Sequence, residues 1–155
     1  MYNSKNTAAK VAAQEKYARD KFISIHSGST WTEYEDRYAV VDLSGATTTS
    51  DGIVKNKFIE TKGRNIPSNE YGTTFLELKK LDNMLDFAEI NDGKAFYFVT
   101  YTDGKSYLFD LTHVKEKYAI QQQWMNDVTI GDYTTQKVLK DVIHLPLFAA
   151  NKKYK

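Results

Sequence analysis

The sequence predicts an α/β protein in which a central mixed β-sheet is flanked by helices. Three observations support this fold class. An amphipathic helical pattern opens the chain, residues 94–101 form an almost continuous apolar and aromatic run, and helical and strand patterns alternate around them. Continuous runs of this kind are typical of strands that are buried on both faces of a sheet. At 155 residues, the chain is long enough for one domain around one hydrophobic core.

Residues 7–25 predict the first helix, because one stripe recurs at steps of three and four. Its members are Ala8, Val11, Glu15, Ala18, Phe22 and Ile25. Glu15 has two interpretations. Its carboxylate either lies at the edge of the buried face, where it reaches solvent or a lysine, or points from the helix toward an acidic site on the sheet.

Residues 38–43 and 53–62 are predicted strands, because both are rich in β-branched and aromatic side chains. In the second strand, Phe58, Glu60 and Lys62 alternate onto one face, and the strand ends in an exposed turn at Gly63. The Ser-, Thr- and Gly-rich stretch between the strands predicts a hairpin loop or flap. We expect residues 63–71 to form a loop long enough to contact a substrate.

The second half of the chain predicts two more helices around a strand hairpin. Thr73 or Thr74 can cap the first of these helices, with Glu77 in the register of a capping box. Asp103-Gly104 is a strong hairpin signal after the apolar run. The remaining predictions are a helix at 112–123, a loop at 126–132, a last strand at 138–147 that exits at Pro146, and a frayed tail.

Composition narrows the functional classes. A formal net charge of +1 gives no overall attraction for nucleic acid, so a polyanion site has to be a local patch. The absence of cysteine excludes disulfides and thiolate zinc sites, and it fits a reducing cytoplasm. The first residues lack the apolar core of a signal peptide, and no segment approaches membrane-spanning length. We therefore expect a cytoplasmic protein without a membrane partner.

Two acids and a lysine form the candidate site. Asp42 closes the first predicted strand, and Glu60 and Lys62 lie on the second, so the three meet if the strands are neighbours. Two carboxylates suit a hard divalent cation such as Mg²⁺, and a lysine can position a water or hold a phosphate. Asp36 competes with Asp42 for the role of first acid. The alternative for Lys62 is a plain ion pair with Glu60, worth at most about 1 kcal/mol if exposed.

These residues resemble the core of the PD-(D/E)XK nucleases, a superfamily that includes restriction endonucleases and Holliday junction resolvases. The string Glu60-Thr61-Lys62-Gly63-Arg64 is similar to the Glu-x-Lys-x-Arg string of many small phage and bacterial members, and residues 77–80 are similar to their helical Glu-Leu-Lys-Lys stretch. The sequence departs from the pattern at Asp42, which no proline precedes. The resemblance implies a restriction-endonuclease-like αβββαβ core over residues 8–111, a family-specific extension over 112–148 and a frayed tail at 149–155, all in one domain.

The same resemblance implies a nuclease that depends on Mg²⁺ or Mn²⁺ and hydrolyses DNA rather than RNA in a bacterial or phage-infected cell. Asp42 and Glu60 would bind the metal, Lys62 would assist the water or the phosphate, and Glu15 would be an auxiliary acid. The cations expected to hold DNA phosphates are Arg64, Lys57, Lys79 and Lys80, although helix lysines also commonly extend into solvent. A homodimer is expected by analogy with nucleases that cut two strands.

Two other functions stay open from the sequence. A catalytically inactive nuclease-fold subunit would have a structural or nucleic-acid-binding role. In a small α/β protein-interaction module, Asp42 and Glu60 would be surface acids without a chemical role. Histidine chemistry is disfavoured, because His26, His113 and His144 are scattered without metal-ligand spacing.

Overall fold

The computed structural model of the protein describes residues 4–36, 38–126 and 137–155. The helices are α1 (Ser4–Ile25), α2 (Leu78–Ile90) and α3 (Val114–Lys117), with a short 3-10 turn η1 (Leu147–Ala149). The strands are β1 (Trp31–Glu33), β2 (Leu43–Thr48), β3 (Val54–Gly63), β4 (Thr73–Glu77), β5 (Gly93–Thr100), β6 (Ser106–Asp110), β7 (Ile120–Asn126), β8 (Lys137–Pro146) and β9 (Lys152–Tyr154). None of the described helices combines the length and the apolar character needed to cross a bilayer.

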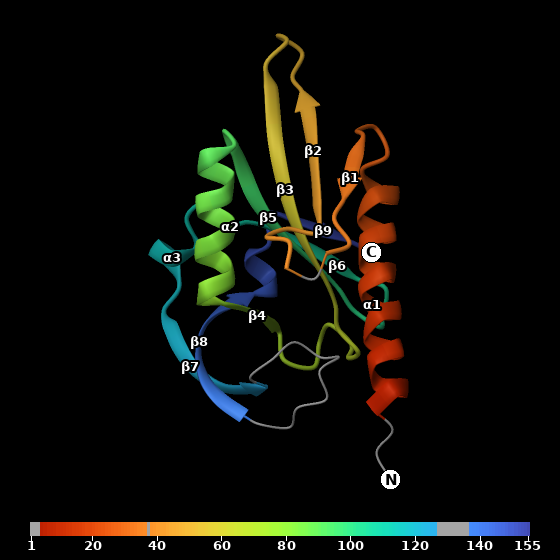
Figure 1. Ribbon diagram of the computed structural model, residues 1–155, viewed down its shortest axis with the longest axis vertical. Coiled ribbons are helices and arrows are strands. Elements are labelled where there is room, and N and C mark those ends of the chain that lie inside the picture. The colour runs from red at the N-terminus through yellow and green to blue at the C-terminus, as the bar shows by residue number, and fades with distance from the viewer. Residues whose placement is uncertain (1–3, 37, 127–136) are drawn as a thin grey trace.

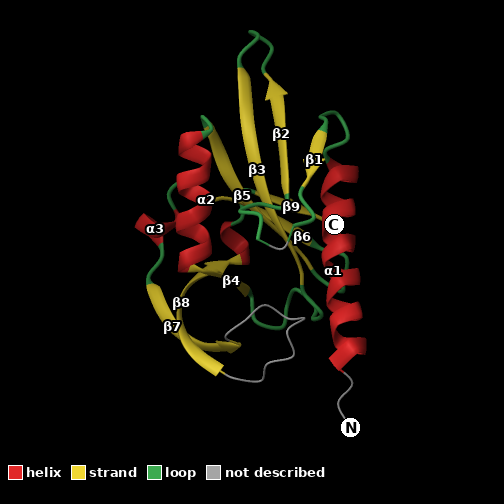
Figure 2. Ribbon diagram, in the orientation of Figure 1, coloured by secondary structure: helices red, strands yellow, loops and turns green. Residues whose placement is uncertain are grey.

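The main sheet has six strands in the order β1-β2-β3-β5-β6-β9 (Figure 1). Strands β3 and β5 are parallel, and the other neighbours are antiparallel. Figure 2 shows α1 and α2 on opposite sides of this sheet, with the smaller antiparallel sheet β4-β8-β7 beside α2. The predicted mixed sheet flanked by helices is therefore confirmed, whereas the second sheet was not predicted.

Strand β3 lies at the centre because its two faces enter two different hydrophobic cores. Phe58 belongs to the cluster beneath α2, together with Leu81 and Met84. Ile59 belongs to the cluster beneath α1, where it joins Phe22. Full burial of such side chains contributes about 1.5–3 kcal/mol each. The predicted alternation of β3 is confirmed, but Ile25, expected in the buried stripe of α1, is 36% exposed.

The strand predicted over residues 38–43 is wrong. β2 begins at Leu43, where that prediction ended, and continues through the threonine-rich stretch that was expected to be a loop or flap. Its register runs from Leu43 opposite Ile59 to Thr48 opposite Val54. Burial of Leu43 in the core beneath α1 fixes this register, and β-branched threonines suit the exposed hairpin that follows.

The helix predicted to begin at Thr73 or Thr74 begins later. Residues 73–77 form β4, which pairs with β8, so Glu77 is the N-cap residue of α2 and makes no side-chain cap hydrogen bond. Most of the helix predicted over residues 112–123 is also absent, because only α3 is helical and β7 then pairs with the other edge of β8. In both places, pairing with a distant strand overrides the local helical pattern.

The hairpin predicted at Asp103-Gly104 is confirmed by the pairing of Thr100 with Ser106, and Pro146 ends β8 as expected. The predicted frayed tail is wrong. Three of its residues, Lys152–Tyr154, form β9, which adds an edge strand to β6 with Lys152 opposite Leu108. The loop predicted at 126–132 lies almost entirely outside the described residues.

Candidate active site

The candidate site lies where β2 separates from β3. The ladder between the two strands ends at Leu43 opposite Ile59, while the other edge of β3 stays paired with β5 as far as Gly63. The N–H of Asp42 still donates to the carbonyl of Ile59 at 2.9 Å. Beyond that point, the next residues of β3 present an edge that β2 does not cover.

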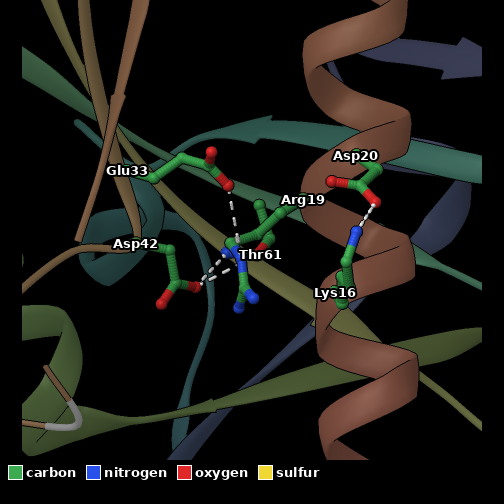
Figure 3. Close-up of polar contacts among 6 residues, drawn as sticks. All are labelled: Lys16, Arg19, Asp20, Glu33, Asp42 and Thr61. Carbon is green, nitrogen blue, oxygen red and sulfur yellow. Dashed lines mark hydrogen bonds and ion pairs between the residues drawn. The ribbon is translucent and has the colours of Figure 1, made fainter. Parts of the chain in front are cut away.

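The side chain of Asp42 continues the ladder in place of the missing strand. Its Oδ2 accepts hydrogen bonds from the backbone N–H of Thr61 at 2.8 Å and from the Thr61 hydroxyl at 3.1 Å (Figure 3). Thr61 is buried, so its N–H would otherwise lack a partner. These contacts fix the Asp42 carboxylate at the edge of β3, against the residue that follows Glu60.

Glu60 is a buried acid, with 8% of its surface exposed, on the α2 face of β3. Its Oε1 lies 2.6 Å from the Nζ of Lys80, in the first turn of α2. Its Oε2 is also buried and has no hydrogen-bond partner among the described residues. Burial, and then the negative charge of Asp42, raise the pKa of Glu60 to about 8, although Lys80 and Lys62 oppose the rise.

Lys62 follows Glu60 by two residues and therefore emerges on the same face of β3. It is half-buried, and its charge favours the ionised form of Glu60. The charges of Asp42 and Lys62 therefore both act on Glu60. The ion pair of Glu60, however, is formed by Lys80 rather than by Lys62.

The other candidate acids lie apart from this pair. No group of three or more His, Cys, Asp or Glu side chains that could hold a metal is present in the described parts of the chain, so Glu15 does not form a three-acid set with Asp42 and Glu60. The auxiliary role of Glu15 stays a prediction. Asp36 is exposed, and its Oδ1 accepts the N–H of Tyr38 at 2.9 Å in a turn. Asp42 is the aspartate whose charge acts on Glu60.

Only some of the predicted phosphate-binding cations surround the site. Lys80 contacts Glu60 directly, and Lys79 is exposed beside it on α2. Arg64 donates from Nη2 to the carbonyl of Phe75 at 3.2 Å and lies 4.5 Å from the centre of the Phe75 ring. Lys57 differs, because it lies an odd number of residues from Glu60 and emerges on the α1 face of β3.

Sequence reasoning missed two features next to the site. Thr61 was not expected to hold Asp42. Its position between Glu60 and Lys62 is the sequence signal that could have identified it. Glu33 of β1 pairs in register with Leu43, next to Asp42, and its Oε1 lies 3.8 Å from the Nε of Arg19 of α1 (Figure 3). Arg19 therefore brings a positive charge from α1 to this end of β2.

The donor atoms of the site fit a hard divalent cation. Mg²⁺ prefers oxygen ligands and keeps several waters, so one or two protein carboxylates suffice. Among the described contacts, the hydrogen bonds of Asp42 use only Oδ2, which leaves Oδ1 for a ligand. The unpartnered Oε2 of Glu60 would supply the second oxygen. A cation at this position would also offset the cost of ionising Glu60 in a buried environment.

Comparison with solved structures identifies a similar fold. The Holliday junction resolvase Hjc of the archaeal hyperthermophile Archaeoglobus fulgidus aligns with a TM-score of 0.51 at 10% sequence identity, over 85% of this chain and 83% of the resolvase. The two chains share a fold. No family model matches this chain, and no curated protein sequence matches it significantly. Holliday junction resolvases belong to the superfamily that the sequence resembles, so the sequence pattern and the structural comparison agree on the fold.

Proposed function

We propose that this protein is a metal-dependent nuclease that hydrolyses phosphodiester bonds of DNA. The observation that carries the proposal is the buried, unpartnered Oε2 of Glu60, an acid on which the charge of the anchored Asp42 carboxylate acts. Two carboxylates at an uncovered strand edge, with a lysine on the same strand, form a minimal site for Mg²⁺ or Mn²⁺ next to a phosphate. The fold shared with a Holliday junction resolvase supports DNA as the substrate.

In this proposal, Asp42 and Glu60 would hold the metal ion; Oδ1 of Asp42 and Oε2 of Glu60 have no hydrogen-bond partner among the described contacts. When bound, the ion supplies positive charge at the phosphoryl oxygens of the scissile phosphodiester. Lys62 orients the attacking water or binds a phosphoryl oxygen, because its ammonium is a compact cation with three donors. Thr61 keeps the Asp42 carboxylate in place through two hydrogen bonds.

The proposed contacts to DNA are phosphate contacts on the α2 side of the site. Lys79 is exposed there and provides a charge without a fixed geometry. Lys80, whose Nζ lies 2.6 Å from Oε1 of Glu60, would supply a second positive charge to a phosphate at the site. Arg64 is held against Phe75 and Tyr97. Its guanidinium would therefore offer a phosphate both a positive charge and a fixed position.

The experiment is a cleavage assay with labelled single-stranded, duplex and four-way-junction DNA in Mg²⁺, in Mn²⁺ and in EDTA. We expect metal-dependent cleavage by the parent protein. Asp42→Asn and Glu60→Gln should each lower the rate at least a hundredfold, because each removes a charged ligand. Matched controls are Asp86→Asn and Glu89→Gln, which make the same chemical changes at exposed positions of α2.

Cleavage that survives both site substitutions would contradict the assignment of the metal ligands. A parent protein that binds DNA but cuts none of the three substrates would favour the inactive nuclease-fold subunit instead.

A further inference from the structure

A lysine patch lies on the α1 side of the six-stranded sheet, on the opposite face from Glu60. Strand parity places its members there. Lys57 is two residues from Ile59, which packs beneath α1, and Lys152 is two residues from Tyr154, which packs in the same cluster. The four-lysine patch consists of Lys55, Lys57, Lys94 and Lys152.

The patch lies past the end of α1. Figure 1 shows the β2–β3 hairpin extending beyond the C-terminal end of that helix, and Lys55 and Lys57 lie at the start of β3 in this hairpin. Lys94 is directly opposite Lys57 in the parallel register of β3 and β5. Three of the four lysines are exposed, and Lys57 is half-buried, with its Nζ 5.6 Å from the centre of the Phe96 ring.

The lysines are close enough to repel one another. Burial, and then the charges of Lys152, Lys55 and Lys94, lower the pKa of Lys57, with Asp110 acting in the opposite direction. The patch also acts on His26, which follows the last residue of α1. Burial lowers the pKa of His26, and the charges of Lys152 and Lys57 lower it further. The Oδ2 of Asp110 lies 3.6 Å from the Nζ of Lys94 and compensates one of the four charges. The patch therefore carries an excess of positive charge on a chain whose formal net charge is only +1.

We propose that the four-lysine patch binds the phosphate backbone of DNA, at a surface separate from the proposed active site. The lysines lie on β3, β5 and β9, and the charges of the other three act on Lys57. A group of four neighbouring lysines can contact several phosphates. Lysine is a compact, strongly hydrated cation on a flexible stem, so the contacts are electrostatic and independent of base sequence.

The patch and the active site face opposite sides of the sheet, so one short stretch of DNA cannot occupy both. The patch therefore holds a second segment or a second arm of the substrate while the first lies near Asp42 and Glu60. The choice of DNA as the polyanion rests on the proposed function, whereas the charge and position of the patch do not.

The test is DNA binding without catalysis, measured by fluorescence anisotropy of a short labelled duplex in EDTA across a series of salt concentrations. The patch variant is the double substitution Lys57→Gln, Lys152→Gln. The matched control is Lys117→Gln, Lys153→Gln, which removes the same charge. Lys153 is the neighbour of Lys152 in β9 and emerges on the opposite face, and both control lysines are exposed.

We expect the patch variant to bind at least tenfold more weakly than the control at low salt. The slope of log affinity against log salt should fall by about 1–2, since each phosphate contact contributes roughly 0.9. The thermal midpoint of the patch variant should equal or exceed that of the parent, because mutual repulsion is relieved, so a folding defect would be recognised. Equal weakening in both double variants, or none in the patch variant, would overturn the proposal.

Two further measurements distinguish this proposal from binding of another polyanion and from the nuclease proposal. Polyglutamate that competes as well as unlabelled DNA at equal charge would show that the patch is not a nucleic-acid surface, and it would also overturn the proposal. Glu60→Gln should keep patch-dependent binding. If the nuclease proposal fails, cleavage is absent while the difference between the two double variants persists. If the patch proposal fails, that difference vanishes while cleavage is unaffected.

Discussion

The Nζ of Lys80 lies 2.6 Å from the Oε1 of Glu60, so the first turn of α2 supplies a cation to an acid buried on β3. Lys80 is one of the charges that oppose the rise in the pKa of Glu60. Replacing Lys80 by methionine removes that charge while keeping an apolar stem of similar length. We expect Lys80→Met to raise the pKa of Glu60 further, measured by NMR of the side-chain carboxyl. The control is Lys79→Met at the exposed neighbouring position. If this control shifts the pKa of Glu60 by the same amount, the effect is not specific to the Lys80–Glu60 pair.

Metal binding should depend on pH, because a carboxylate ligand has to be ionised. With the pKa of Glu60 raised to about 8, binding below that pH releases a proton. The affinity for Mn²⁺ should therefore rise about tenfold per pH unit from pH 6 toward pH 8 and level off above it. Calorimetry in two buffers of different ionisation enthalpy measures both the affinity and the proton release. An affinity that is constant over this range would rule out Glu60 as a ligand.

Folding stability should also depend on the ionisation of Glu60. The pKa of Glu60 is about 8 in the folded chain against a reference value of 4.5, so the folded state binds the proton more tightly. This stabilisation is complete below about pH 4.5 and is lost as the pH rises through about 8. The loss is on the order of a few kcal/mol in the free energy of unfolding, since each pKa unit corresponds to about 1.4 kcal/mol.

Glu60→Gln removes this titration, so its stability relative to the parent should increase from pH 5 to pH 9. Urea unfolding at several pH values in EDTA measures the difference. Glu89→Gln, on the exposed end of α2, should follow the parent at every pH. Parallel stability profiles for the parent and Glu60→Gln would show that Glu60 ionises normally in the folded protein.

Asp42 should have a structural role that can be separated from its role in metal binding. Asp42→Ala leaves the buried N–H and hydroxyl of Thr61 without their acceptor, which should cost about 1–3 kcal/mol in the free energy of unfolding. Asp42→Asn keeps a carbonyl acceptor, so it should cost less than about 1 kcal/mol while abolishing metal-dependent cleavage. Denaturant unfolding of the two variants provides the comparison. Equal stability losses would mean that the charge, and not the acceptor, stabilises this edge.

Gly63 should be required for the packing of α1 on β3. A Cβ at this position would lie 2.5 Å from the backbone carbonyl oxygen of Gln14, so Gly63→Ala forces helix and sheet apart. We expect a loss of about 1–3 kcal/mol in the free energy of unfolding. Gly28→Ala is the matched control, because a Cβ there meets nothing within 4 Å. β3 ends at Gly63 as predicted, but this glycine is half-buried against α1 and does not lie in an exposed turn.

The sequence by itself determined the features that depend on neighbouring residues. Phe58 and Ile59 point to opposite faces because side chains alternate along a strand, but burial of the two in separate cores is a feature of the fold, since the sequence predicted only one core. The Asp103-Gly104 hairpin is also local, because positive φ at Gly104 needs no distant partner. The motif from Glu60 to Lys62 belongs to this class, since two residues two apart on a strand share a face wherever the strand lies.

Tertiary structure decided what depends on distant pairing. Thr73–Glu77 is a strand because β8 lies beside it, and Lys152–Tyr154 is ordered because β6 offers an edge. The same rule applies to the site. The sequence placed Asp42 and Glu60 on two strands, but only the departure of β2 from β3 exposes the Thr61 N–H that anchors Asp42, and only the packing of α2 sets Lys80 against Glu60. Backbone groups and buried charges must find partners, and the completed fold determines which partners are within reach.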